Sequence, residues 1–126
     1  MRTWIEQKPK SHNCGPIAVA VIAGVTLEES IKAIGKTGST TTKQLAEGLR
    51  KLGYNCPNRC RQMPKPPLAI AQVKSPTRKS GWHWVVIDGD KIYDGINGKP
   101  DGTVRWASGE RITSYLPLTK TNSSKE

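Results

Sequence analysis

The sequence has few acidic residues, few histidines and cysteines, and no long apolar run. Its 126 residues include 20 Lys and Arg but only 10 Asp and Glu, with 2 His and 3 Cys. No stretch reaches the roughly 18 apolar residues that a membrane-spanning helix needs. The first ten residues, MRTWIEQKPK, lack the apolar centre of a secretory signal peptide. We therefore expect a soluble, cytoplasmic protein with no membrane partner.

The small number of cysteines argues against a disulfide framework. Three cysteines cannot all pair within one chain, and in a reducing compartment they are expected to remain thiols. Cys56 and Cys60 form the motif C-P-N-R-C, whose spacing fits half of a zinc site or a small redox pair. The chain has no second ligand pair, so we expect plain thiols there, with no metal and no cofactor.

Basic residues outnumber acidic ones, which gives a net charge of +10 and an attraction to anionic surfaces. Between residues 55 and 80 there are basic residues and no acid: Arg59, Arg61, Lys65, Lys74, Arg78 and Lys79. This stretch either forms a solubilising face or attracts an acidic substrate, an acidic protein or a nucleic acid. Because no motif for DNA or RNA binding accompanies the charge, we favour a peptide or protein partner, acidic in character.

The pattern of apolar residues predicts one α+β domain at 1–118, followed by a flexible tail at 119–126. A first helix follows Asn13 as its cap and runs to Val25, apolar on every side and therefore buried. Capping boxes predict a second helix at 26–34 and a third from Thr41 to Gly53. Strands are expected at 58–63, 68–74, 82–88, 91–94 and 114–118, in an antiparallel sheet packed on the helices.

Cys14 stands at the start of the predicted buried helix, in the stretch H-N-C-G-P. The positive end of a helix dipole favours thiolate over thiol, and the thiolate is the nucleophilic form. A buried core cysteine is the structural alternative. A nucleophile also needs a base, which must be His12 or His83. His12 lies on the approach to the helix, so His83 is the better candidate.

His83 lies in the stretch GWHWVVIDGDKIYDG, which predicts a β-hairpin with a two-residue turn at Gly89 and Asp90. If Asp88 faces Lys91 across this turn, then Val85 faces Asp94, and Asp94 shares one face of the hairpin with His83. A carboxylate in that place can orient the imidazole toward a nucleophile. An interfacial histidine and a strand-end carboxylate are the structural alternatives.

An acyl-transfer site also needs donors for the oxyanion of its tetrahedral intermediate. The backbone N–H of Cys14, at the helix N-terminus, is one candidate. The side-chain amide of Gln7 is a second, although an exposed glutamine would explain that residue equally well.

Taken together, the residues resemble the papain-like cysteine peptidases. The features that carry the resemblance are a Gln, then N-C-G-P at a buried helix, then H-W-V-V-I-D-G and a Tyr-Asp pair at the end of the return strand. The chain is most similar to the double-glycine leader peptidases that trim bacteriocin precursors, including stand-alone relatives of that domain, over 7–118. The resemblance implies a papain-like fold in a bacterial or phage protein. It implies that Cys14 is the nucleophile, His83 the general base, Asp94 the orienting residue and Gln7 the oxyanion donor.

Two functions from different classes follow. The first is a thiol hydrolase that cleaves a peptide, amide or isopeptide bond. The second is a basic binding module on a peptidase scaffold, such as an inhibitor encoded by a phage or a mobile element, in which the triad has no catalytic role.

Overall fold

Three helices and two antiparallel sheets make up the described part of the chain. The computed structural model describes residue 5 and residues 12–64, 66–74, 82–89, 91–93 and 112–120. The elements in chain order are α1 (Cys14–Ala23), α2 (Leu27–Ile34), α3 (Thr42–Lys51), β1 (Tyr54–Asn55), β2 (Leu68–Lys74), β3 (Trp82–Asp88), β4 (Lys91–Tyr93), β5 (Ile112–Pro117) and β6 (Thr119–Lys120). The α+β class expected from the sequence is confirmed.

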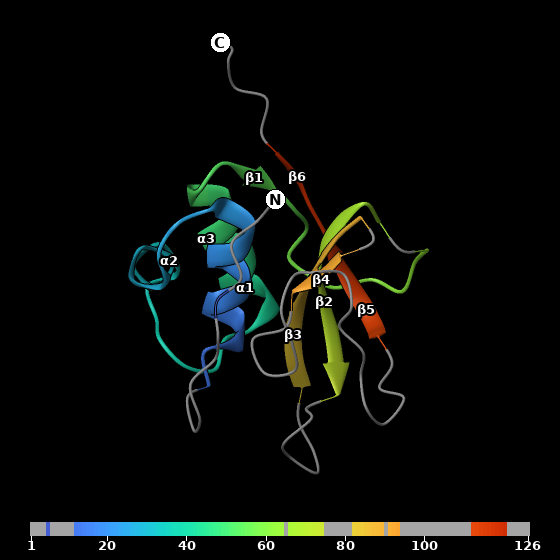
Figure 1. Cartoon of the computed structure of the whole chain (residues 1–126), viewed down its shortest axis with the longest axis horizontal. Coiled ribbons are helices and arrows are strands. Elements are labelled where there is room, and N and C mark those ends of the chain that lie inside the picture. The colour runs from blue at the N-terminus through green and yellow to red at the C-terminus, as the bar shows by residue number, and fades with distance from the viewer. Residues whose placement is uncertain are drawn as a thin grey trace.

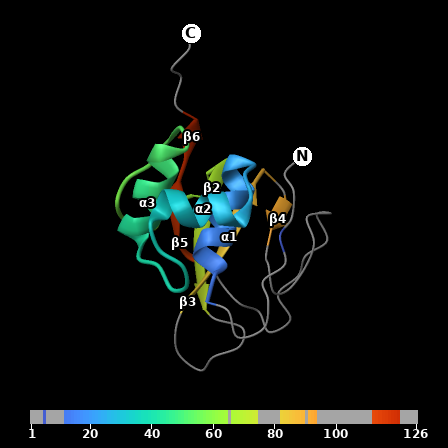
Figure 2. The same cartoon turned by 90° about the vertical axis from the view of Figure 1, so that its left-hand side faces the viewer.

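The larger sheet has four strands in the order β4-β3-β2-β5, and the smaller one pairs β1 with β6. All three helices lie on one side of the larger sheet, with α1 nearest to it (Figure 1). In the view from the helical side, α2 and α3 stand in front and the sheet lies behind (Figure 2). Helix α1 therefore lies between the sheet and the other two helices.

Helix α1 is buried along nearly its whole length, as its apolar sequence predicts. Its residues from Gly15 to Ile22 are all buried. Burying a branched aliphatic side chain contributes roughly 1.5–3 kcal/mol, so this helix supplies a large share of the core. The helix ends at Ala23 and not at Val25 as expected, because Gly24 adopts a left-handed conformation with φ of 70°.

The two capping boxes predicted for α2 and α3 are both present. Thr26 accepts a hydrogen bond from the Glu29 N–H while the Glu29 carboxylate accepts one from the Thr26 N–H. Thr41 and Gln44 exchange the same pair of bonds at the start of α3. These side chains satisfy N–H groups that a helix start leaves open, which fixes where each helix begins.

The central strands β2 and β3 have the bounds predicted for them, and they pair antiparallel along their full length. The face of the sheet toward α1 presents Ile70, Trp84, Val86, Tyr93 and Leu116. The opposite face presents Ala69, Ala71, Val73, Val85 and Ile87, which are also buried. Both faces carry buried apolar residues, so β2 and β3 lie at the centre of the core.

The strand predicted at 58–63 is wrong. In this segment only Arg61 pairs, through a single antiparallel bridge to Tyr115. The guanidinium of Arg50 on α3 donates to the Cys56 carbonyl at 2.8 Å and to Asn58 Oδ1 at 2.6 Å. These bonds hold the start of the segment against α3, and only Arg61 reaches the edge strand β5.

Two short strands were not expected. Tyr54 and Asn55 pair with Lys120 and Thr119, so regular structure continues two residues past the predicted boundary at Leu118. The sheet strand predicted at 114–118 is instead β5, which begins earlier, at Ile112, and ends at Pro117.

Candidate active site

Cys14 is the first residue of α1, and its neighbours explain how the helix start is placed. A Cβ on Gly15 would overlap the Thr40 hydroxyl and come within 3.0 Å of Leu45 Cδ2, so only glycine permits this close approach. The buried Ser30 of α2 donates to the Pro16 carbonyl at 2.7 Å. These contacts with residues of α2, α3 and the loop between them hold the first turn of α1 in place. Cys14 lies at the start of this turn and is half-buried.

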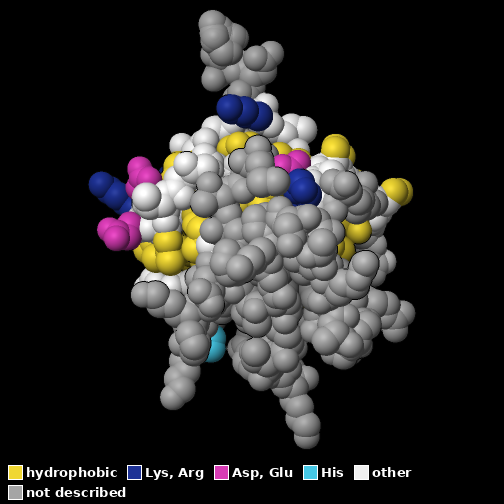
Figure 3. Space-filling model, in the orientation of Figure 1, with side chains coloured by type: hydrophobic (Ala, Val, Ile, Leu, Met, Phe, Trp, Pro, Cys, Tyr) yellow, Lys and Arg dark blue, Asp and Glu magenta, His cyan; other side chains and the backbone are white. Residues whose placement is uncertain are grey.

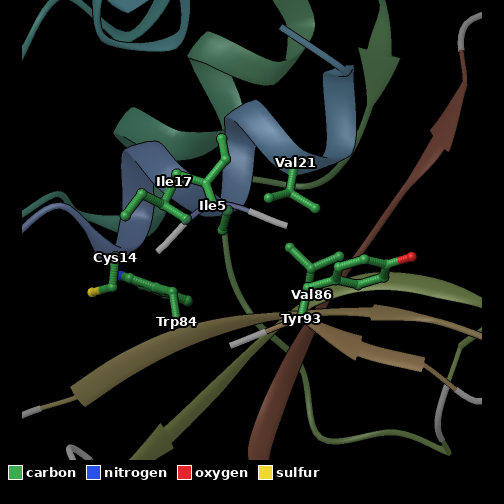
Figure 4. A pocket seen from close by; sticks show the side chains of 8 residues that line it. Ile5, Cys14, Ile17, Val21, Trp84, Val86 and Tyr93 are labelled. Atoms are coloured by element: carbon green, nitrogen blue, oxygen red, sulfur yellow. The ribbon is translucent and has the colours of Figure 1, made fainter. Parts of the chain in front are cut away.

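His83 on β3 is only 2% exposed, and its imidazole forms a hydrogen bond with the Cys14 thiol. The thiol also accepts a hydrogen bond from the backbone N–H of Trp84. Because a strand's N–H groups lie in the plane of its sheet, the sulfur lies beside the backbone of β3. Figure 4 shows Cys14 at the end of α1, next to the Trp84 side chain. The structure thus brings Cys14 and His83 together, while His12 is exposed.

The surroundings of Cys14 favour its charged form. Burial raises the pKa of the Cys14 thiol, but the hydrogen bond with His83, the Trp84 N–H, the charge of His83 and the Gly15 N–H each lower it, and the net effect is a lowered pKa. Hydrogen bonds and a positive charge stabilise a thiolate, which is the form that attacks carbonyl groups. Cys14 therefore has the electrostatic setting of an activated nucleophile.

The other two thiols have the opposite setting. Burial raises the pKa of Cys56, against a smaller lowering by the Arg50 charge. Burial also raises the pKa of Cys60, against hydrogen bonds with Thr42 and Ser114. Their sulfur atoms contact α3, with Cys56 Sγ 3.8 Å from the Ala46 carbonyl and Cys60 Sγ 3.9 Å from the Thr42 hydroxyl. These two cysteines are packing residues between α3 and the segment that follows it.

The C-P-N-R-C motif would need further ligands to bind zinc. In the part of the chain that the structure describes, no three His, Cys, Asp or Glu side chains come together as metal ligands. Among the same residues, no helix is long and apolar enough to cross a membrane.

The predicted oxyanion donor Gln7 and the predicted orienting residue Asp94 lie outside the described residues. The hairpin that leads to Asp94 has the predicted register, with Asp88 opposite Lys91, Ile87 opposite Ile92 and Val86 opposite Tyr93. The expected pairing of Val85 with Asp94 lies one pair beyond the last of these. The roles of Gln7 and Asp94 stay predictions from the sequence.

Asn13 occupies the N-cap position of α1, but it does not act as the predicted cap. Its side chain makes no capping hydrogen bond, and its backbone has φ of −93° and ψ of 19°. Asn13 Oδ1 instead accepts from the Gly38 N–H at 2.7 Å and from the Thr37 hydroxyl at 3.1 Å. The carboxamide therefore joins the start of α1 to the loop between α2 and α3.

A small apolar pocket begins at Cys14 and follows α1 (Figure 4). It lies between α1 and the strands β3 and β4, and Ile5 contributes to its wall. The lining residues are Ile5, Cys14, Ile17, Ala18, Val21, Trp84, Val86 and Tyr93. Ile5 and Cys14 therefore line the same pocket.

Positive charge is exposed on the described part of the basic stretch. Arg59 and Arg61 are exposed, whereas Lys65, Arg78 and Lys79 lie outside the described residues. Further basic side chains stand near α2 and β6 in the face shown in Figure 3.

Three contributors to the site were not identified from the sequence: the Trp84 N–H, the Gly15 N–H and the Asn13 contact with the loop. The glycine of Cys-Gly-Pro was a signal for the close approach at Gly15, because glycine inside a helix is disfavoured without a packing reason. The two others depend on backbone positions that no side-chain pattern encodes.

Comparison of the chain with models of known protein families and with curated proteins found no match.

Proposed function

We propose that the chain is a thiol hydrolase with a papain-like fold, which cleaves a peptide, amide or isopeptide bond. The observation that carries this proposal is the hydrogen bond between Cys14, at the tip of a buried helix, and His83, on the central sheet. A nucleophile in contact with a base is the arrangement that acyl transfer requires. The helices packed on one side of an antiparallel sheet support the papain-like arrangement at a coarse level.

In the proposed reaction, the Cys14 thiolate attacks the carbonyl carbon of the substrate, and the carbonyl electrons move to the oxygen. The Cys14 N–H and the Gln7 amide stabilise this oxyanion. Protonated His83 then gives its proton to the leaving amine, so the C–N bond breaks and a thioester remains. Neutral His83 next takes a proton from water, the hydroxide displaces the thiolate, and a carboxylic acid is released. Asp94 keeps the imidazole in the required orientation.

The test is turnover of a peptide library by the full chain, read by mass spectrometry. Cys14→Ala and His83→Ala are expected to abolish cleavage with the fold retained. Cys56→Ala and His12→Ala are the matched controls, because each removes the same functional group elsewhere and is expected to leave cleavage intact. Cleavage by the Cys14→Ala variant would contradict the proposal.

The two residues with sequence-based roles can be tested in the same assay. Asp94→Asn is expected to leave a residual rate, because the imidazole would still be present but poorly oriented. Gln7→Ala is expected to reduce the rate about a hundredfold or more if the amide binds the oxyanion. A full rate in either variant would remove that residue from the mechanism.

The alternative is a basic binding module on the same scaffold, of the kind that a phage or mobile element uses as an inhibitor. The excess of 20 basic over 10 acidic residues favours this function as a second candidate. Binding of an anionic partner that persists in Cys14→Ala, with no cleavage by the unmodified protein, would support it over the hydrolase.

A further inference from the structure

Asn13 directly precedes Cys14, and its side chain forms hydrogen bonds with a loop and none with the backbone of α1. Its side-chain oxygen accepts the Gly38 N–H and the Thr37 hydroxyl. Its backbone carbonyl accepts the Ile17 N–H at 2.8 Å, which is the first backbone bond of α1. One residue thus connects the loop at 37–38 to the turn that carries Cys14.

The bonding of Asn13 affects the Cys14 thiol through the backbone N–H groups at the start of α1. A capping side chain accepts from the N–H of the second or third helical residue. The third residue is Pro16, which has no N–H, so Gly15 has the only N–H that a cap at Asn13 would use. That N–H lies by the Cys14 sulfur instead, where it lowers the pKa of the thiol. A capping side chain at position 13 would compete for it.

The same loop also packs against the turn at Gly15. Thr40 lies so close to Gly15 that a side chain there would overlap its hydroxyl. The Thr40 hydroxyl is buried and has no hydrogen-bond partner among the described residues. The contact at Thr40 is therefore one of packing, and the hydrogen bonds that join the loop to the helix start are those of Asn13.

We propose that Asn13 is a positioning residue for Cys14: by binding the loop at 37–38, its carboxamide holds the first turn of α1 in place and leaves the Gly15 N–H to the sulfur. The proposal rests on the proposed role of Cys14 as the nucleophile, and it assigns a role to a residue outside the predicted catalytic set. Asn13 acts through Cys14 and need not touch the substrate.

The experiment is the rate of Cys14 alkylation by iodoacetamide as a function of pH, with the full chain. Asn13→Ala removes the acceptor of both loop bonds. It is expected to raise the pH midpoint by about one unit, which slows alkylation near neutral pH by about tenfold because less thiolate is present. Thr26→Ala is the control: it removes the cap of α2 and is expected to leave the midpoint unchanged.

Asn13→Ser separates positioning from simple stability. Serine is a good helix cap but is too short to reach the loop as asparagine does, so it is expected to keep the helix while taking the Gly15 N–H. The midpoint should therefore rise in this variant too, with His83 unchanged. An unchanged midpoint in both Asn13→Ala and Asn13→Ser overturns the proposal. A midpoint at the ordinary thiol value in the unmodified protein contradicts the proposed function itself, and this proposal with it.

Discussion

At the scale of single residues, the three thiols of the chain differ in what surrounds them. Hydrogen bonds and the His83 charge outweigh burial at Cys14, whereas burial dominates at Cys56 and Cys60. We predict that iodoacetamide near neutral pH modifies Cys14 first, because alkylation requires the thiolate. Mass mapping of the native protein over time measures the order. Faster modification of Cys56 or Cys60 would contradict the assignment of Cys14 as the activated thiol.

The lowered pKa of Cys14 also predicts how stability depends on pH. The folded protein releases this proton at a lower pH than the unfolded chain, whose thiol titrates near its ordinary value of 9.0. The resulting stabilisation is complete above that value and is lost as the pH falls through the folded pKa. The free energy of unfolding of the unmodified protein, minus that of Cys14→Ala, should therefore increase as the pH rises toward 9.0 and level off above it.

Urea denaturation over this pH range measures that difference, and Cys60→Ala is the matched control. Burial raises the pKa of Cys60, so its contribution has the opposite sign: it is present at low pH and decreases as the pH rises past the unfolded value. The same trend for both variants would show that the two thiols do not differ in the way described.

The pairing of Cys14 with His83 could be predicted from the sequence. A cysteine at a helix start and a histidine on a hairpin strand were enough to predict their meeting, because the chain has only three cysteines and two histidines. The Trp84 N–H was not predictable, since backbone donors have no sequence signature. Asn13 has the residue type of a cap, and its partner on the loop became visible only when the fold placed residues 37 and 38 beside it.

At the scale of secondary structure, α2 and α3 meet at a glycine. A Cβ on Gly48 would lie 2.6 Å from Ile34 Cγ1 and 3.3 Å from Ile34 Cα. Alanine favours a helix over glycine by about 1 kcal/mol. Even so, we predict that Gly48→Ala lowers the free energy of unfolding by about 1–3 kcal/mol, because the added methyl group must push the helices apart.

Chemical denaturation measures this effect, with Glu47→Ala as the control on the exposed face of the same helix. The control is expected to change stability by less than about 0.5 kcal/mol. If Gly48→Ala stabilises the protein instead, α2 and α3 can move apart at little cost in free energy, which would contradict the prediction.

Local signals determined which elements could be predicted. The capping boxes at Thr26 and Thr41 and the short turn after Asp88 each depend on neighbours in the sequence, and all three were confirmed. The pairing of β1 with β6 joins segments more than sixty residues apart, which no local pattern indicates. The failed strand at 58–63 shows the same limit, since Arg50 of α3 bonds to Asn58 at its start and the single bridge from Arg61 reaches Tyr115, more than fifty residues away.

At the scale of the whole molecule, the net charge of +10 acts at longer range than the site. We predict that Arg59→Glu and Arg61→Glu together, with Lys65→Glu added, weaken binding of an acidic peptide at low salt. Alkylation of Cys14 by a small neutral reagent should stay unchanged, because the charges guide the partner and do not contact the thiol. Fluorescence anisotropy over a salt series measures the binding, and slower alkylation in the variants would contradict this separation.

A nucleic-acid partner makes a different prediction for the same surface. The logarithm of its binding constant would fall linearly with the logarithm of the salt concentration, and the affinity would depend little on which nucleic acid is offered. A mobility-shift assay with double- and single-stranded DNA and RNA at moderate salt distinguishes the two. Submicromolar shifts that persist in Cys14→Ala would favour the binding module, and the absence of a shift would favour the acidic peptide.

In the proposed mechanism, Cys14 and His83 act as one chemical unit. The most direct measurement is labelling of the native protein with a thiol-reactive peptide probe, followed by mass mapping, in the unmodified chain and in His83→Ala. We predict a single adduct on Cys14 in the unmodified chain and a loss of most labelling in His83→Ala, while His12→Ala labels normally. An adduct on Cys56 or Cys60, or labelling of Cys14 that does not depend on His83, would contradict the account.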